Sequence, residues 1–182
     1  MALRSTVYRC ALDVANVDLG YYAAHDLTLA RHPSETEARL MLRVLAFALH
    51  ATDAMEFGRG LSSEDEPDLW DRDETGRIRH WIMLGLPDER RLRRAAGRSD
   101  RVTLITYGER ALKPWIGREG RALDEIEHLD AWIVKDDELG AIAALANRNM
   151  AISCTLQEGR VWVSDGTTTV EVEPQVVTSS SG

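Results

Sequence analysis

Apolar and polar side chains alternate in the first element of the chain. Over residues 6–14, Tyr8, Cys10, Leu12 and Val14 fall on one face of an extended segment, which is typical of a half-buried strand. A second strand is predicted at 22–30, after a turn at 16–20. Further strands are predicted at 77–84, 102–107 and 129–134, and the run at 102–107 is apolar on both faces, which indicates a central strand.

Helical spacing replaces this alternation after Pro33. Ser34 and Glu37 form an S-x-x-E capping box, and apolar residues then recur every three to four positions up to His50. The sequence therefore predicts a helix over 34–50. Shorter helices are expected after Pro87, over 110–118 with Pro114 limiting its length, and over 136–146.

The last part of the chain changes to short strands. Residues 150–173 read as three strands with turns at 158–159 and 165–166, and Asp-Gly at the second turn favours a hairpin. We expect one domain over residues 1–174 and a disordered tail over 175–182. The predicted fold class is α+β: a mixed β-sheet flanked by helices, with a C-terminal antiparallel meander.

Composition narrows the class of protein. The 182 residues contain no apolar stretch of the ~20 residues that a membrane span needs, and the N-terminus shows no secretory signal. The two cysteines, Cys10 and Cys154, form no CxxC pair, so buried thiols are expected rather than a disulfide. These features predict a cytoplasmic protein that does not bind membranes.

Charge is unevenly distributed along the chain. The net charge is −8, yet residues 77–121 hold twelve bases against five acids, a local balance of +7, directly after seven acids in residues 61–76. One interpretation is two solvated faces that balance each other. The other is an acidic metal-binding loop beside a surface that attracts phosphate.

Motifs for common chemistries are absent from the sequence. No phosphate-binding glycine loop occurs, and the five histidines lack zinc-ligand spacing. Glu35 and Arg39 lie one helical turn apart, and Met83 follows Asp68 by fifteen positions. That separation resembles the spacing in PD-(D/E)XK nucleases, where an Asp and a strand acid hold Mg²⁺ and a lysine follows the acid by two positions. In this chain, Met83 stands at the position of the strand acid and Gly85 at the position of the lysine.

Longer stretches resemble one family. The segments "MALRSTVYRCALDVANVD", "LTLARHPSETEARLMLRVLAFALHA", "FGRGLSSEDEPDLW" and "WIMLGLPDERR", with "TYGERA" and "LQEGRVWVS", are similar to the YaeQ family over residues 1–164. The resemblance implies a bacterial protein with a restriction-endonuclease-like fold, a variant of the PD-(D/E)XK core. The family pattern has an acid where this chain has Met83 and a Glu where it has Ala38. It matches at Glu35, Arg39, Asp68, Trp70, Asp88 and Arg90.

Three functional hypotheses follow from the resemblance. The first is a non-catalytic or degenerate module that binds nucleic acid or phosphate through Arg39 and Arg90. The second is a Mg²⁺-dependent phosphodiesterase with Asp68 and Glu35 as candidate catalytic and metal-binding residues, although a methionine thioether is a poor Mg²⁺ ligand. The third is a structural or protein-interaction domain in which these residues form a buried charge network. Under the first two, Glu35, Asp68 and Met83 converge on one cleft lined by Trp70 and Asp88.

Overall fold

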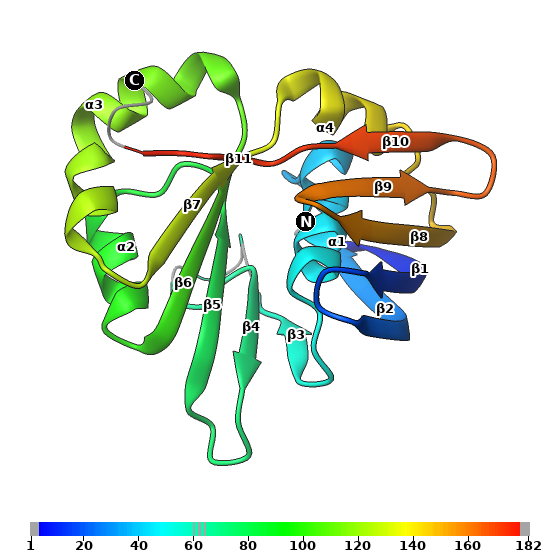
Figure 1. Ribbon diagram of the computed structural model, residues 1–182, viewed down its shortest axis with the longest axis horizontal. Coiled ribbons are helices and arrows are strands. Elements are labelled where there is room, and N and C mark those ends of the chain that lie inside the picture. Colours follow the sequence, from blue (N-terminus) through cyan, green and yellow to red (C-terminus); the bar gives the residue numbers. More distant parts are fainter. Residues whose placement is uncertain (1–3, 60, 62, 64, 179–182) are drawn as a thin grey trace. The chain divides into compact units, whose positions relative to one another are not determined.

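A computed structural model describes residues 4–59, 61, 63 and 65–178 (Figure 1). Within residues 1–174, which we expect to form one domain, it distinguishes two compact units that alternate along the chain. Unit 1 comprises Met1–Ala51 and Asp137–Glu173, and unit 2 comprises Thr52–Asp136 and Pro174–Gly182. Glu64 of the acidic segment and residues 179–182 of the tail lie outside the described residues.

Unit 1 is built on a five-stranded sheet with strand order β10-β9-β8-β1-β2. The strand β1 pairs antiparallel with β2 and parallel with β8. The buried face of β1 packs against helix α1, whereas alternate residues such as Ala11 and Asp13 are exposed. The elements are β1 (Thr6–Asn16), β2 (Tyr21–Arg31), α1 (Glu37–His50), α4 (Asp136–Ala143), β8 (Asn149–Gln157), β9 (Arg160–Ser164) and β10 (Thr169–Val172).

The start of α1 differs from the expected capping box. The helix begins at Glu37, and its N-cap is Thr36, whose side-chain oxygen accepts a hydrogen bond from the Arg39 backbone N–H at 3.1 Å. The Ser34 hydroxyl is instead hydrogen-bonded to His32 Nδ1 at 2.6 Å. Ser34 was therefore wrong as the cap, because either hydroxyl can cap a helix and the contact of Ser34 with His32 leaves Thr36 as the cap.

The C-terminal meander is confirmed. The strands β8, β9 and β10 pair antiparallel in sequence order, and their turns fall at Glu158–Gly159 and after Ser164. Cys10 and Cys154 are buried free thiols, as expected. Burial raises the pKa of each thiol to about 12, so neither serves as a nucleophile near neutral pH.

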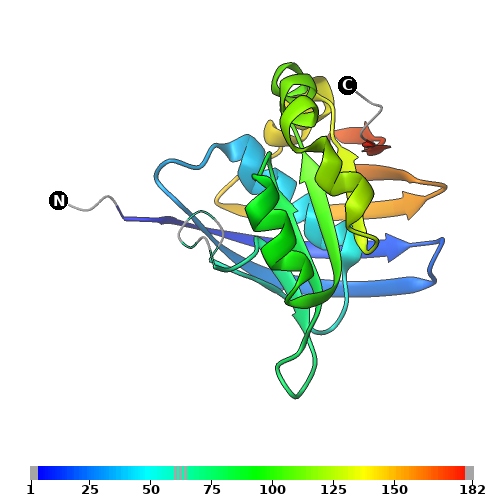
Figure 2. The same cartoon turned by 90° about the vertical axis from the view of Figure 1, so that its left-hand side faces the viewer.

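Unit 2 is built on a six-stranded sheet with strand order β11-β7-β6-β5-β4-β3. Its centre is a β5-α2-β6-α3-β7 segment, in which the three strands are parallel and the two helices lie on one face (Figure 2). The elements are β3 (Met55–Phe57), β4 (Leu69–Arg72), β5 (Ile78–Leu84), α2 (Glu89–Ala96), β6 (Ser99–Thr106), α3 (Glu109–Glu125), β7 (Leu129–Ile133) and β11 (Gln175–Val176).

The core of unit 2 lies between this sheet and its two helices. Met83 of β5 and Leu104 of β6 pack there against Leu92 of α2 and Trp115 of α3. The Trp115 indole N–H donates to the Pro87 carbonyl at 2.7 Å, so the one polar atom of this buried side chain is satisfied. The core therefore fixes how α3 is rotated about its axis.

Two elements of unit 2 extend beyond their predicted limits. Helix α3 continues through Pro114 to Glu125, because Pro114 is exposed while Leu112, Trp115 and Ile116 are buried. Proline removes one backbone hydrogen bond, and the burial of these neighbours offsets that loss. In the tail, Gln175 and Val176 pair with β7 and Val177 is buried, although disorder was expected from residue 175.

The described residues thus form a mixed α+β protein with two mixed sheets and four helices. The sequence predicted one mixed sheet, and this prediction was wrong. The alternating pattern of a strand shows that it has one buried face but not which strand it pairs with. None of the described helices has the length and apolar character that crossing a membrane requires.

His80 lies on β5 and contacts a polar side chain of the neighbouring strand β6. Its Nε2 lies 2.8 Å from the hydroxyl of Thr103, which is fully buried on β6. Burial, with a smaller contribution from Arg101, lowers the pKa of His80 to about 4, although Asp71 and Asp130 oppose this shift. The histidine is therefore neutral in the folded protein at neutral pH.

Replacing His80 with glutamine should weaken the acid sensitivity of folding. Since the histidine pKa rises from about 4 in the folded protein to about 6.5 on unfolding, its contribution to stability is complete above pH 6.5 and falls as the pH drops toward 4. The loss is on the order of 3 kcal/mol. Urea unfolding of both proteins at pH 7.5, 6, 5 and 4 measures it. Parallel curves for wild type and His80→Gln would contradict the assignment.

Candidate functional site

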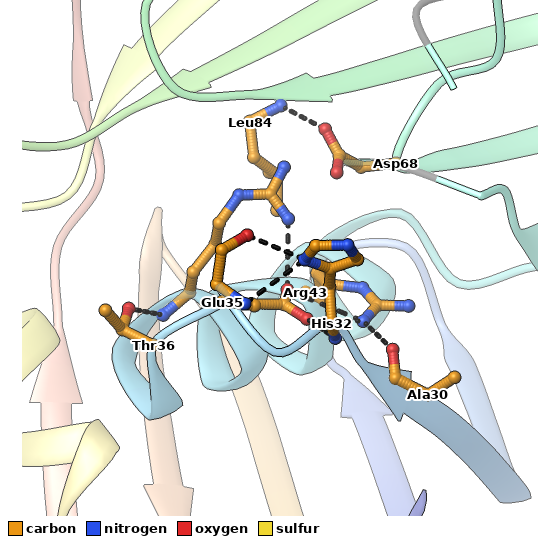
Figure 3. Close-up of polar contacts among 9 residues, drawn as sticks. Ala30, His32, Glu35, Thr36, Arg43, Asp68 and Leu84 are labelled. Carbon is orange, nitrogen blue, oxygen red and sulfur yellow. Dashed lines mark hydrogen bonds and ion pairs between the residues drawn. The ribbon is translucent and has the colours of Figure 1, made fainter. Parts of the chain in front are cut away.

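Glu35 lies just before α1 in unit 1 and is buried. Its Oε1 lies 3.0 Å from Nη1 of Arg39 and its Oε2 lies 3.3 Å from Nη1 of Arg43. The same Oε2 accepts a hydrogen bond from the His32 backbone N–H at 3.3 Å (Figure 3). Both carboxylate oxygens are therefore engaged by donors of unit 1.

Arg43 connects this charge cluster to the sheet. Its guanidinium donates to the backbone carbonyl of Ala30 on β2 at 3.2 Å, while Glu35 lies in the segment that joins β2 to α1 (Figure 3). Arg39 and Arg43 are each 7% exposed. A buried carboxylate between two guanidinium groups is stable only as a complete set, because removal of one member leaves an uncompensated buried charge.

Sequence reasoning missed Arg43, although a signal was present. Arg43 follows Arg39 by four residues, so both arginines lie on one face of α1. Glu35 was expected inside the first helical turn, whereas it precedes the helix by two residues. The Glu35–Arg39 pair is buried.

Asp68 lies at the start of β4 in unit 2 and is also buried. Its Oδ2 accepts a hydrogen bond from the Leu84 backbone N–H at 2.8 Å (Figure 3). Its own backbone N–H donates to Ile82 at 3.0 Å, and its carbonyl accepts from Gly58 at 3.0 Å. The carboxylate thus extends the β4–β5 pairing beyond the last backbone pair.

Met83 and Gly85 occupy the two positions where a nuclease of the PD-(D/E)XK type has an acid and a lysine. Met83 is 5% exposed and packs in the core beneath α2 and α3. Gly85 has a φ of 104°, a conformation that side-chain-bearing residues rarely adopt, and its N–H donates to Ile105 at 2.9 Å. Neither position presents a polar side chain.

The remaining expected site residues have local roles in unit 2. Asp88 is the N-cap of α2 and accepts a hydrogen bond from the Arg91 N–H at 2.8 Å. Trp70 lies edge-to-face with Trp81, with ring centroids 6.3 Å apart, and the Arg72 guanidinium lies 4.2 Å from the Trp70 ring. Such stacking stabilises an exposed arginine in a fixed orientation.

Arg90 differs from the other expected residues. It is exposed in the first turn of α2 and forms no ion pair with any residue that the structure describes. Two other arginines of α2 are paired: Arg93 with Glu89 and Glu125, and Arg94 with Asp65. Arg90 is therefore the expected site residue best placed to meet an anion from solution.

The expected site residues fall in both units. Glu35 and Arg39 belong to unit 1, whereas Asp68, Trp70, Met83, Asp88 and Arg90 belong to unit 2. Their convergence on one cleft stays a prediction. Among the described residues, no three His, Cys, Asp or Glu side chains gather closely enough to hold a metal ion.

Solved structures with a similar fold come from two other bacteria. The crystal structure of YaeQ protein from Xanthomonas axonopodis pv. citri is 44% identical, with a TM-score of 0.91 over 96% of this chain and 98% of that one. The crystal structure of YaeQ protein from Pseudomonas syringae is 37% identical, with a TM-score of 0.91 over 96% of both chains.

Curated relatives agree over the same length. The uncharacterized protein YaeQ of Escherichia coli K12 is 40% identical over 172 residues, which cover 94% of this chain and 95% of that protein. The uncharacterized protein YaeQ of Salmonella typhi is 39% identical over 173 residues, which cover 95% of this chain and 96% of that protein. The family model described as YaeQ protein matches residues 1–174. The chain therefore belongs to the YaeQ family.

Proposed function

We propose that this protein is a non-catalytic module that binds nucleic acid through the basic residues of segment 77–121 in unit 2. The proposal rests on the twelve basic residues between positions 77 and 121. Seven of them form ion pairs, which leaves five without an ion-pair partner among the described residues. These five are Arg90, Arg91, Arg98, Arg110 and Lys113.

Unpaired surface cations favour an anionic partner. Phosphate groups release counterions when lysine or arginine neutralises them, which supplies affinity without sequence recognition. The overall charge of −8 opposes such binding at long range, but screening at physiological salt limits this repulsion to about 8 Å. The unpaired cations of segment 77–121 therefore matter more than the net charge.

The absence of catalysis is part of the proposal. A nuclease of the PD-(D/E)XK type, whose fold we propose for this chain from its family resemblance, needs two acids and a lysine at a strand end. Here Met83 is packed in the core and Gly85 offers no side chain. Asp68 already accepts a backbone hydrogen bond from Leu84. These positions support binding without metal-dependent cleavage.

A structural role for Glu35 is a second proposal, which one observation favours. The Glu35 carboxylate ties Arg39 and Arg43 of α1 to the end of β2 in unit 1. On this proposal the cluster stabilises unit 1 rather than binding phosphate, and Arg39 stays paired in the working protein.

Gel shifts at about 50 mM salt test nucleic-acid binding. We expect micromolar affinity that weakens as salt rises, because phosphate contacts release counterions. Binding should be equal with Mg²⁺ and with EDTA, and the probe should stay intact. Arg90→Ala should weaken binding, whereas Arg9→Ala, which removes an exposed arginine of unit 1, should not. No shift with any DNA or RNA probe would refute the proposal, and probe cleavage in Mg²⁺ would refute its non-catalytic part.

Glu35→Gln should destabilise folding by about 3–5 kcal/mol, because two buried guanidinium groups lose their counterion. The control is Glu37→Gln, since Glu37 is exposed and lies 3.7 Å from Arg31, and it should cost less than about 1 kcal/mol. Urea unfolding at pH 7 measures both. If the two variants unfold at the same urea concentration, the Glu35 cluster has no special structural role.

Met83→Glu tests whether the β5 face is core or a vacant metal site. Burying a carboxylate in the core should destabilise the protein by several kcal/mol. Melting with and without Mn²⁺ measures this, with Met83→Leu as the control of similar volume. If Mn²⁺ raises the melting temperature of Met83→Glu alone, the position faces a metal site and the core assignment is wrong.

A further inference from the structure

The exposed face of α3 carries a row of cations around a stretch without bulky side chains. We call this face the α3 ridge and define it by Arg110, Pro114, Gly117 and Arg121 along its centre, with Lys113 and Arg118 on its flanks. All six residues are exposed. Positions 110, 114, 117 and 121 follow the three-to-four-residue spacing that places side chains on one face of a helix.

Packing within unit 2 fixes the direction in which the α3 ridge points. Leu112, Trp115 and Ile116 are buried on the opposite side of the helix, and the Trp115 N–H is bonded to Pro87. The Glu89 backbone N–H at the start of α2 donates to Glu119 at 2.8 Å, which adds a second tie. The ridge is therefore presented to solvent in a fixed direction.

Three of the four acids of α3 have partners that the structure describes. Glu109 accepts from the Asp136 N–H at 3.0 Å, and Glu119 accepts from the Glu89 N–H and lies 3.8 Å from Arg118 of the ridge. Glu125 pairs with Arg121 at 2.5 Å and with Arg93. The cations at 110 and 113 are left without an ion-pair partner among the described residues.

The middle of the α3 ridge has no long side chains. A Cβ atom placed on Gly117 would meet no atom within 4 Å, so the space above this glycine is open. Pro114, one turn earlier, has a compact ring and no N–H. A large ligand can thus approach the helix backbone here while the surrounding cations reach to its sides.

We propose that the α3 ridge binds the sugar-phosphate backbone of double-helical nucleic acid, which deepens and rests on the proposed function. The twelve residues from Arg110 to Arg121 span about 16 Å. An α-helix about 10–12 Å wide fits a major groove about 12 Å wide. The flanking Lys113 and Arg118 then face the phosphates on its two walls.

The composition of the α3 ridge selects a duplex over a single strand. Proteins that bind single strands stack the bases on aromatic side chains, and the six ridge residues include no aromatic. Long cationic side chains on either side of Pro114 and Gly117 can contact phosphates, and phosphate contacts do not distinguish one base from another. Recognition is therefore independent of sequence.

A matched pair of glycine variants tests the position of the site. Gly117→Glu places a carboxylate in the centre of the α3 ridge, and Gly140→Glu places one on α4 of unit 1, where the space above the glycine is also open. Both variants carry the same charge and should fold, which circular dichroism checks. Affinity for a 20-base-pair duplex should fall about tenfold or more in Gly117→Glu and stay within about twofold in Gly140→Glu.

A second pair of variants counts phosphate contacts. Removing Arg110 and Lys113 together by alanine substitution should reduce the slope of log affinity against log salt by about 1.8 for duplex DNA, or about 0.9 for each lost contact. Alanine at Arg9 and Arg148, two exposed arginines of unit 1, removes the same charge and should leave the slope unchanged.

The outcomes separate the two proposals. If the wild type binds duplex and the ridge variants bind like their controls, the α3 ridge is not the site, although the protein still binds nucleic acid. If the wild type prefers a single strand of the same sequence, the duplex assignment is overturned. If the wild type binds no nucleic acid at all, the proposed function itself fails.

Discussion

The parallel pairing of β1 with β8 holds unit 1 together. It joins residues 9–16 to residues 149–156, and every other strand of that sheet is added to one side or the other of this pair. Helix α1 covers the same two strands, so the buried charge cluster at its start depends on the pairing as well. Along the chain, most of unit 2 lies between the two segments that form unit 1.

The charged residues of this chain divide into two roles by the contacts that they make. Glu35, Asp68 and Asp88 use their carboxylates to satisfy donors of their own unit, and each lies where a segment enters a helix or a strand. Arg90, Arg110 and Lys113 do the opposite, since they are exposed and have no ion-pair partner among the described residues. Residues that match the nuclease pattern in type and spacing therefore have structural contacts, while the cations suited to bind phosphate lie elsewhere in unit 2.

Local patterns in the sequence predicted most elements but not their partners. The alternation from Tyr8 to Val14 was sufficient for β1, and the apolar spacing after Met41 was sufficient for α1, because each element buries one face. The strand β4 was missed, since Asp71 and Arg72 make it polar and its pairing with β5 is what orders it. The tail was read as disordered for the same reason: Val177 is buried only through the pairing of β11 with β7.

The site could be predicted only in part from sequence. Spacing indicated that Glu35 and Arg39 lie close to each other, although Glu35 precedes the helix. It could not show that Arg43 completes the cluster from the next turn. Met83 could be recognised as a departure from the nuclease pattern, whereas its place in the core depends on Leu92 and Trp115, which come from two other elements.

The order of segments along the chain also has a consequence for synthesis on the ribosome. Residues 52–136, which contain the whole β5-α2-β6-α3-β7 segment, are made before β8. Residues 52–136 of unit 2 can therefore fold before β8 is made. During this time β1 and β2 form a hairpin in which the β1 edge that later pairs with β8 has no partner. Such an edge is prone to pair with other chains until its partner arrives. In the nascent protein this edge of β1 stays unpaired from the emergence of Asn16 until that of Gln157.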